Sequence, residues 1–281
     1  MKKFSTAKWK IPSEQFFGRL ALLKTSIEQW RITSHSGRIF LAEFLGTMTL
    51  TVSFLHSIFI NSQSLFYPQC LGCCGNAFIN LRNFTASPEH SQADLIEVST
   101  IWGVSLTAAL YISSGVSGGH LNPAISIGLA SVGKLPWKKV PVYLFAQYLG
   151  ALAGALLALA TYWEAINALT PMDSTTMGIF GIYSAKKIKT AGAAVLDQLF
   201  GTATFLLVIC AIRDRRNSMS GGPCGLEPFA IGFANIDILH LSFGYNCGTP
   251  LNPARDFSPR LMGLLFGWGS KTLSNTSKCV I

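Results

Sequence analysis

The residues that could act on a solute are two copies of one tripeptide, Asn122-Pro123-Ala124 and Asn252-Pro253-Ala254. Asn is a strong helix N-cap and Pro suits the first helical position, so each copy predicts the start of a short helix. A helix N-terminus carries roughly half a positive charge, and an Asn amide donates hydrogen bonds to a passing oxygen. These groups predict a site for water or a neutral hydroxylated solute that repels cations. An enzyme is not expected, and neither is a cofactor or a metal, because no nucleophile and base pair or ligand cluster stands out.

The composition indicates that the elements carrying these motifs lie in a membrane. Of the 281 residues, 49% are apolar and only 12% are charged, about half the charged share of an ordinary soluble domain. A membrane-spanning helix needs about 20 mostly apolar residues. Such stretches are found at 39–61, 95–113, 140–162, 191–212 and, more weakly, 228–243. The predicted fold class is an all-α membrane protein.

Basic residues fall on alternate sides of these spans and predict the orientation. Residues 1–38 hold eight Lys or Arg and two Glu, and the connections at 134–139 and 213–216 are also basic. Such a bias places the N-terminus in the cytoplasm, where the basic segment is expected to meet anionic lipid rather than nucleic acid. We expect a plasma-membrane protein with a basic N-terminal segment at 1–38, a channel domain at 39–269 and a polar tail at 270–281.

The two tripeptides belong to a longer repeat. Glu43-Phe44-Leu45-Gly46-Thr47 stands upstream of the first copy and Gln198-Leu199-Phe200-Gly201-Thr202 upstream of the second, on spans that cross in opposite directions. The halves are therefore inverted in the membrane, an arrangement that places a site at the midplane. Two half-helices would dip from opposite faces and meet there, lining a cavity. This favours a pore over two capped surface helices, which a single copy would suggest.

The first repeat contains an extra stretch at 62–94, predicted to be extracellular. It holds Asn83-Phe84-Thr85, a glycosylation acceptor pattern at Asn83 on the side where glycosylation occurs. The same loop has a Cys-x-x-Cys-Cys run at 70–74. No second pair of ligands follows it, so a disulfide or free thiols are favoured over a zinc site.

Three motifs resemble the aquaporin, or major intrinsic protein, family: Ala42-Glu43-Phe44-Leu45-Gly46-Thr47, Ser117-Gly118-Gly119-His120-Leu121-Asn122-Pro123-Ala124 and Leu251-Asn252-Pro253-Ala254-Arg255-Asp256. Asp256, directly after Arg255, resembles the glycerol-conducting branch, the aquaglyceroporins, and so does Trp102 within Ile101-Trp102-Gly103. The resemblance implies a homotetramer in the lipid bilayer. It also implies a passive channel for water, glycerol and other small neutral solutes that excludes ions and protons.

The resemblance also implies an outer constriction formed by Trp102, Arg255 and the residues twelve and three before Asn252, which here are His240 and Thr249. Glycerol channels usually have Gly at the first of these positions, whereas His is similar to water-selective members. An imidazole beside Arg255 would narrow the opening and favour water, while the small Thr249 would widen it. A water-selective aquaporin is therefore one alternative.

A second alternative comes from the end of the sequence. The resemblance implies six spans, and the spacing after Asn122 places the sixth near Ser270, where only the polar residues 270–281 remain. The sequence therefore predicts five full spans instead of six. The competing hypothesis is a non-conducting shortened variant that associates with full-length aquaglyceroporins and modulates them.

Two further residues are expected to support the pore. Glu43 is ionisable within a span, which is costly enough that a specific role is the default interpretation. We expect it to face inward and to accept hydrogen bonds that hold the loop before Asn122. Gln198 is its neutral equivalent in the second repeat.

Overall fold

The structure, a computed structural model, describes residues 32–51, 91–169, 180, 191–214, 216–217, 225–243 and 251–274. Every secondary-structure element in this part of the chain is a helix, which confirms the predicted all-α class. The elements in order are α2 (His35–Thr51), α4 (Ser91–Ser117), α5 (Pro123–Ser131), η1 (Trp137–Lys139), α6 (Val140–Leu169), α8 (Ala191–Ile212), α9 (Glu227–Ala234), η2 (Asn235–Ser242), α10 (Pro253–Leu265) and α11 (Lys271–Ser274).

The helices differ from the predicted spans mainly at their ends. Helix α2 begins at His35, inside the predicted N-terminal segment, because the Ser34 hydroxyl accepts a hydrogen bond from Gly37 N at 3.3 Å and caps it. Helices α4 and α6 extend past the apolar stretches, since backbone hydrogen bonding continues into polar residues. By length and composition, Trp137–Asn167 and Val195–Ile212 qualify as membrane spans among the described residues.

Two further differences concern the second repeat. The predicted span at 228–243 is an α-helix, α9, that continues as a π-helix, η2. The first residues of the predicted polar tail form α11, where Thr272 is buried and its carbonyl accepts a hydrogen bond from Arg260 Nη1 at 3.2 Å. The tail is packed there because it gives the buried guanidinium an acceptor.

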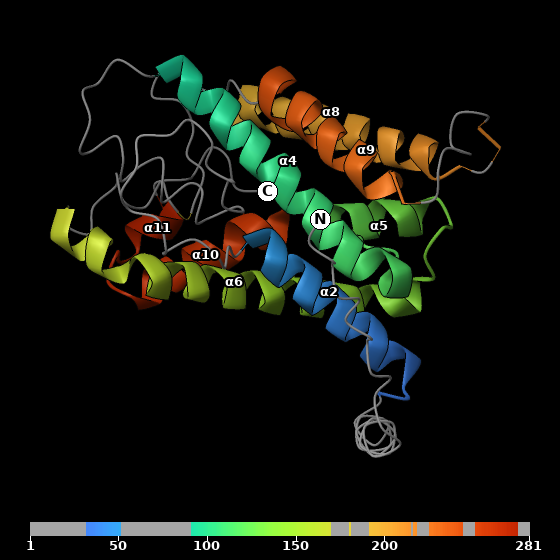
Figure 1. Cartoon of the computed structure of the whole chain (residues 1–281), viewed down its shortest axis with the longest axis horizontal. Coiled ribbons are helices and arrows are strands. Elements are labelled where there is room, and N and C mark those ends of the chain that lie inside the picture. The colour runs from blue at the N-terminus through green and yellow to red at the C-terminus, as the bar shows by residue number, and fades with distance from the viewer. Residues whose placement is uncertain are drawn as a thin grey trace, which may run out of the picture.

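The first half of the molecule is built on close contact between α2, α4 and α6 (Figure 1). Gly150 and Gly154 of α6 lie directly against α2: a Cβ atom at Gly150 would collide with the carbonyl oxygen of Phe44, and one at Gly154 with the Thr51 side chain. Small residues of this kind let two helix backbones approach closely in a membrane.

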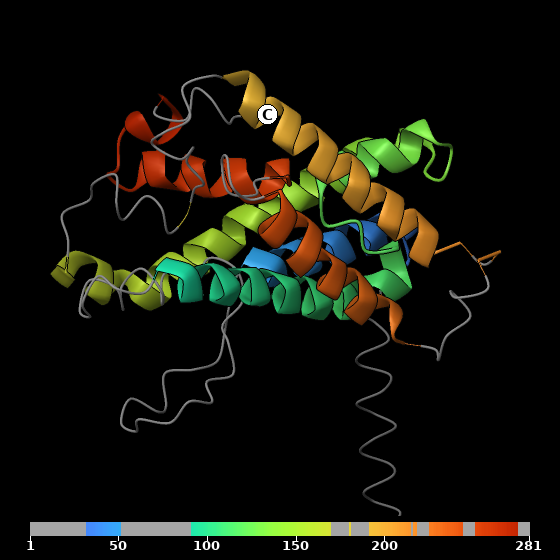
Figure 2. The same cartoon turned by 90° about the horizontal axis from the view of Figure 1, so that it is seen from above.

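The second half packs on the first mainly against α4 and α6. Helix α9 and η2 pack on α4, and α10 packs on α6. The two short helices α5 and α10 lie on opposite sides of the molecular centre in both views (Figure 2). Residues 121–122, before α5, contact residues 251–252, before α10. This is the arrangement that the inverted repeat predicts, and it brings residues near 122 and 252 together.

Replacing Gly150 with Ala is expected to destabilise the fold by about 1–3 kcal/mol, because the new methyl group would force α2 and α6 apart. The free energy of unfolding in detergent micelles is the measurement. Gly115→Ala is the matched control, because Gly115 also lies in a helix, α4, and a Cβ there meets nothing within 4 Å. Equal unfolding free energies for the two variants would contradict the close contact.

Candidate pore

The two Asn-Pro-Ala segments begin the two short helices in the same way. The Asn122 side-chain oxygen accepts a hydrogen bond from Ala124 N at 2.9 Å, and Pro123 occupies the first turn of α5. The Asn252 side-chain oxygen accepts from the backbone amides of Ala254 and Arg255, at 3.1 and 3.2 Å, at the start of α10. Each Asn is therefore an N-cap whose oxygen is bound and whose amide nitrogen is directed elsewhere.

The side-chain amide nitrogens of the two asparagines form hydrogen bonds from one half to the other. Asn122 Nδ2 donates to the carbonyl oxygen of Leu251 at 3.0 Å, and Asn252 Nδ2 donates to that of Leu121 at 2.8 Å. An amide nitrogen carries two hydrogens, so each Asn has a second donor to offer to a solute. The reciprocal pair fixes the two half-helices end to end.

The two acceptor leucines adopt an unusual backbone conformation. Leu121 has φ 56° and Leu251 has φ 30°, a region that bulky residues rarely occupy and that costs about 1–3 kcal/mol. Both are buried. The strain is retained where it presents the two carbonyls to the opposite asparagines. The sequence analysis did not identify these residues, although a Leu directly before Asn in both copies was a usable signal.

Glu43 anchors the loop that precedes α5. Its carboxylate accepts four hydrogen bonds, from Ser117 Oγ at 2.6 Å, His120 N at 2.9 Å, Leu121 N at 2.8 Å and Gln147 Nε2 at 2.8 Å. The side chain is completely buried. The four donors surround the charge, so the carboxylate holds the strained Leu121 in place from behind.

Gln147 links this network to the half-helix and was not identified from the sequence. Besides its bond to Glu43, its amide nitrogen donates to Ser126 Oγ of α5 at 3.0 Å. The ring of His120 stacks on Tyr143, with centroids 4.5 Å apart, and its Nδ1 lies 3.1 Å from Ser126 Oγ. The only feature of the sequence that could have predicted this hydrogen-bonded group is the presence of polar residues on otherwise apolar spans.

Gln198 occupies the equivalent place in the second repeat. Its Oε1 accepts a hydrogen bond from Leu251 N at 3.1 Å, just as the carboxylate of Glu43 accepts from Leu121 N. The side chain is buried. A neutral amide therefore supports the second loop where a carboxylate supports the first.

A cavity runs along this meeting point. Its volume is about 50 Å³, counted as the space open to the centres of water molecules. One water needs about 10–15 Å³ by this measure, so the cavity has room for several. It is lined by Leu50, Trp102, Leu106, Leu110, Gly119, His120, Leu121, Asn122, Phe205, Ile209, Arg213, Ile231, Asn235, Leu251, Asn252 and Arg255.

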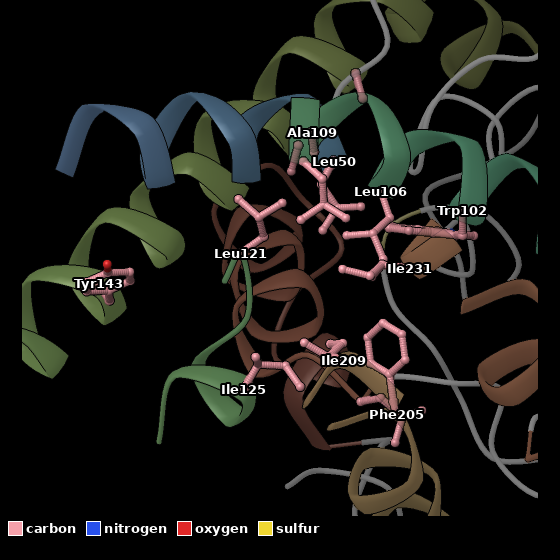
Figure 3. Packing of buried hydrophobic residues seen from close by; sticks show 14 of the residues in the cluster. Leu50, Trp102, Leu106, Ala109, Leu121, Ile125, Tyr143, Phe205, Ile209 and Ile231 are labelled. Atoms are coloured by element: carbon pink, nitrogen blue, oxygen red, sulfur yellow. The ribbon is translucent and has the colours of Figure 1, made fainter. Parts of the chain in front are cut away.

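The cavity wall is apolar on the side of the spanning helices. Leu106 and Ile231 lie beside Trp102, and Phe205 and Ile209 continue the wall away from it (Figure 3). The polar groups come mostly from the loops and half-helices. A solute in the cavity would thus contact hydrogen-bonding groups on one side and hydrocarbon on the other.

Two of the four predicted constriction residues meet in the lining of the cavity. The Arg255 guanidinium carbon lies 4.0 Å from the centroid of the Trp102 ring, and both residues are buried. The backbone of position 240 lies in the π-helix η2, but the side chain of His240 lies outside the described part of the chain, as do all of Thr249 and Asn83. The structure therefore places Trp102 and Arg255 and leaves the other two residues as predictions.

Asp256 lies behind the cavity rather than in it. Its two carboxylate oxygens accept from Arg260 Nε at 2.8 Å and Arg260 Nη2 at 3.0 Å, in a buried pair on α10. A fully paired buried charge of this kind holds its helix turn in one conformation. Asp256 is thus paired with Arg260 and is not among the residues that line the cavity.

A second arginine, Arg213, also lines the cavity, although the sequence predicted it only as a marker of orientation. Arg213 Nε lies 2.6 Å from Glu227 Oε1 at the start of α9. Next to it, hydrogen bonds from the Arg216 side chain and backbone hold the pKa of Asp214 below its usual value. Two arginines, Arg255 and Arg213, thus line the cavity, and within the described residues no cluster of metal ligands accompanies them.

Two inverted halves whose capped half-helices meet around a cavity define the inverted-repeat class of membrane proteins. The chain belongs to the major intrinsic protein family, whose model matches residues 30–268. Its members are integral membrane channels, and the relatives of this chain are aquaporins. The predicted family resemblance is confirmed.

The similar proteins include several aquaporins. Aquaporin-10 of Milnesium tardigradum is 36% identical over 266 residues, covering 92% of this chain and 58% of the relative. Aquaporin-9 of Rattus norvegicus is 34% identical over 267 residues, covering 92% and 79%. Aquaporin-10 of Homo sapiens is 41% identical over 177 residues, covering 61% and 58%. The matched region thus spans less than two thirds of the length of both aquaporin-10 relatives.

A solved structure agrees with the fold. The aquaglyceroporin from Plasmodium falciparum superimposes with a TM-score of 0.67 at 27% sequence identity, covering 87% of this chain and 91% of that chain.

Proposed function

We propose that this chain forms a passive channel for water and small neutral polyols such as glycerol. The observation that carries the proposal is the crossed pair of asparagine amides, each bound to the opposite loop and bordering one cavity. A solute can exchange its hydration for these donors one partner at a time. The aquaglyceroporin relationship supports polyols as a substrate class.

Ion exclusion follows from the charges around the same cavity. Two helix N-termini with Asn122 and Asn252 present positive partial charge to the cavity, and Arg255 and Arg213 line it, Arg213 as the ion-pair partner of Glu227. No acidic side chain borders the cavity among the described residues. Cations and protons are therefore repelled at the asparagines and at Arg255, whereas a neutral solute carries no net charge to be repelled.

The orientation and assembly are parts of the same proposal. The basic residues at 1–38, 134–139 and 213–216 favour a cytoplasmic N-terminus and a cytoplasmic Arg213 end. Family resemblance supports a homotetramer in the plasma membrane. Asn83 would then lie on the extracellular side, where it can be glycosylated.

Proteoliposomes containing the purified full chain test the proposal. Light scattering after an osmotic step measures water flux, and the recovery phase in a glycerol gradient measures polyol flux. Both fluxes are expected to exceed those of empty vesicles. An inserted chain that gives no flux above empty vesicles would overturn the channel assignment and favour the non-conducting partner of full-length aquaglyceroporins.

Replacing His240 with Gly is expected to raise glycerol flux relative to water flux, because removing the imidazole would widen a constriction shared with Trp102 and Arg255. The measurement is the ratio of the two permeabilities in the same vesicle preparation. Phe229→Leu, on an exposed position of α9, is the control for insertion. An unaltered ratio would show that position 240 faces away from the pore, and the constriction assignment would be withdrawn.

A further inference from the structure

A buried amide borders the cavity from a spanning helix. Asn235 is only 6% exposed and lies at the junction where α9 becomes the π-helix η2. Its side chain has no hydrogen-bond partner within the described part of the chain. Its amide atoms are not among the polar atoms that are fully enclosed without a partner, so the amide opens onto the cavity that Asn235 lines. The side chain therefore requires a partner from the cavity itself.

The packing of α9 fixes Asn235 in this position. Its backbone amide donates to the carbonyl oxygen of Ile231, one turn earlier, which places the two residues on one helix face. Ile231 lies in the cavity wall beside Leu106 and Trp102 (Figure 3). Gly232 brings the helix close to α4, because a Cβ there would collide with Thr107. The face that carries Asn235 thus cannot rotate away from the cavity.

The helix geometry changes at this residue. The bonds of η2 run from one residue to the fifth before it, as in the bond from Phe243 N to the carbonyl of Ile238 at 3.2 Å. Such wide turns are rare and often occur at functional sites. The change begins at the residue that presents the amide to the cavity.

The chemistry of the wall gives this amide a specific consequence. The cavity residues from α2, α4 and the middle of α8 are hydrocarbon or aromatic, and the asparagines of the half-helices stand apart from them. Asn235 adds a donor and an acceptor to the otherwise apolar side. A polyol carries a hydroxyl on each carbon and cannot turn freely in a narrow passage. Its hydroxyls therefore point to both sides of the cavity, and each side must offer a hydrogen-bond partner. A water molecule is small enough to form its hydrogen bonds with the groups of one side alone.

We propose that Asn235 is a specificity-determining residue, a third amide that binds polyol hydroxyls inside the pore and favours polyols over water. This inference rests on the proposed channel function. It assigns to the spanning helix a role that the paired asparagines of the half-helices do not fill.

The test compares Asn235→Leu with the unaltered chain in proteoliposomes. Leucine has the same branched arrangement of side-chain heavy atoms and no polar group. The ratio of glycerol to water permeability is expected to fall about fivefold, the factor that corresponds to one neutral hydrogen bond. Asn235→Ser should recover part of the ratio, because a hydroxyl both donates and accepts. Phe233→Leu, on the exposed side of the same helix, should leave the ratio unchanged.

The outcomes separate this inference from the function on which it rests. If the unaltered chain conducts and Asn235→Leu has the same ratio, Asn235 does not select solutes and the inference fails alone. An equal loss of both fluxes in Asn235→Leu, with no recovery in Asn235→Ser, would indicate a structural role and would also overturn it. If the unaltered inserted chain conducts neither solute, the channel function fails and the inference falls with it.

Discussion

An Asn252→Asp chain is expected to lose water and polyol flux by about 5- to 100-fold and to leak cations. The aspartate has no donor for the carbonyl oxygen of Leu121, which lies 2.8 Å from the amide nitrogen it replaces. Two acceptors would then face each other, and an unsatisfied buried group costs about 1–3 kcal/mol, which corresponds to that range of rates. The two helix N-termini would stabilise the new negative charge, and that charge would offset the positive potential that repels cations.

Flux and ion leak are measured together in the same vesicles, by light scattering and by an internal pH-sensitive dye. Asn217→Asp is the matched control, because Asn217 also donates its amide to a carbonyl, that of Ala211 at 3.3 Å, but on the exposed surface. Unchanged flux together with unchanged ion exclusion in Asn252→Asp would show that Asn252 is not at the middle of the pore.

Replacing Glu43 with Ala is expected to remove most of the folded channel. Four donors would lose their acceptor in a buried site, and breaking a buried charged cluster costs about 3–5 kcal/mol. Total stabilities are only about 5–15 kcal/mol. The unfolding free energy in detergent and the yield of monodisperse protein measure the loss.

The second repeat provides an internal comparison for Glu43. Gln198→Ala removes a neutral hydrogen bond to Leu251 N, for which a loss of about 1 kcal/mol is expected. Glu43→Gln should fall between the two, because an amide offers one accepting oxygen instead of two. If Gln198→Ala were as destabilising as Glu43→Ala, the charge at Glu43 would not be what holds the first loop.

The sequence predicts the fold class and the half-helices well because both depend on local signals. Apolar stretches mark the spans, and Asn with Pro marks a helix start whatever surrounds it. The inversion of the repeat then brings position 122 near position 252 without any knowledge of side-chain packing. The structure shows these features as described for α5 and α10.

The supporting contacts could not be predicted in the same way. The positive φ angles of Leu121 and Leu251 arise from bonds to residues more than 120 positions away. The hydrogen bond from Gln147 to Glu43 joins α6 to α2. The π-turn at Asn235 reflects packing against α4 rather than any local motif. Arg213 was assigned to a membrane side by charge, whereas its place at the cavity depends on how α8 and α9 converge.

The crossed amide bonds tie completion of the pore to the order of protein synthesis. Asn122 and its acceptor Leu251 are 129 residues apart, so at about 5–20 residues per second roughly 6 to 26 seconds separate the two during translation. Throughout that interval the first half lies in the bilayer with its strained loop lacking its partner. During this time, water or the insertion machinery must supply hydrogen-bond partners to the polar groups of that loop. If the ribosome stalls during this interval, the first half remains without the second, and the carbonyl oxygen of Leu121 lacks its hydrogen bond from Asn252.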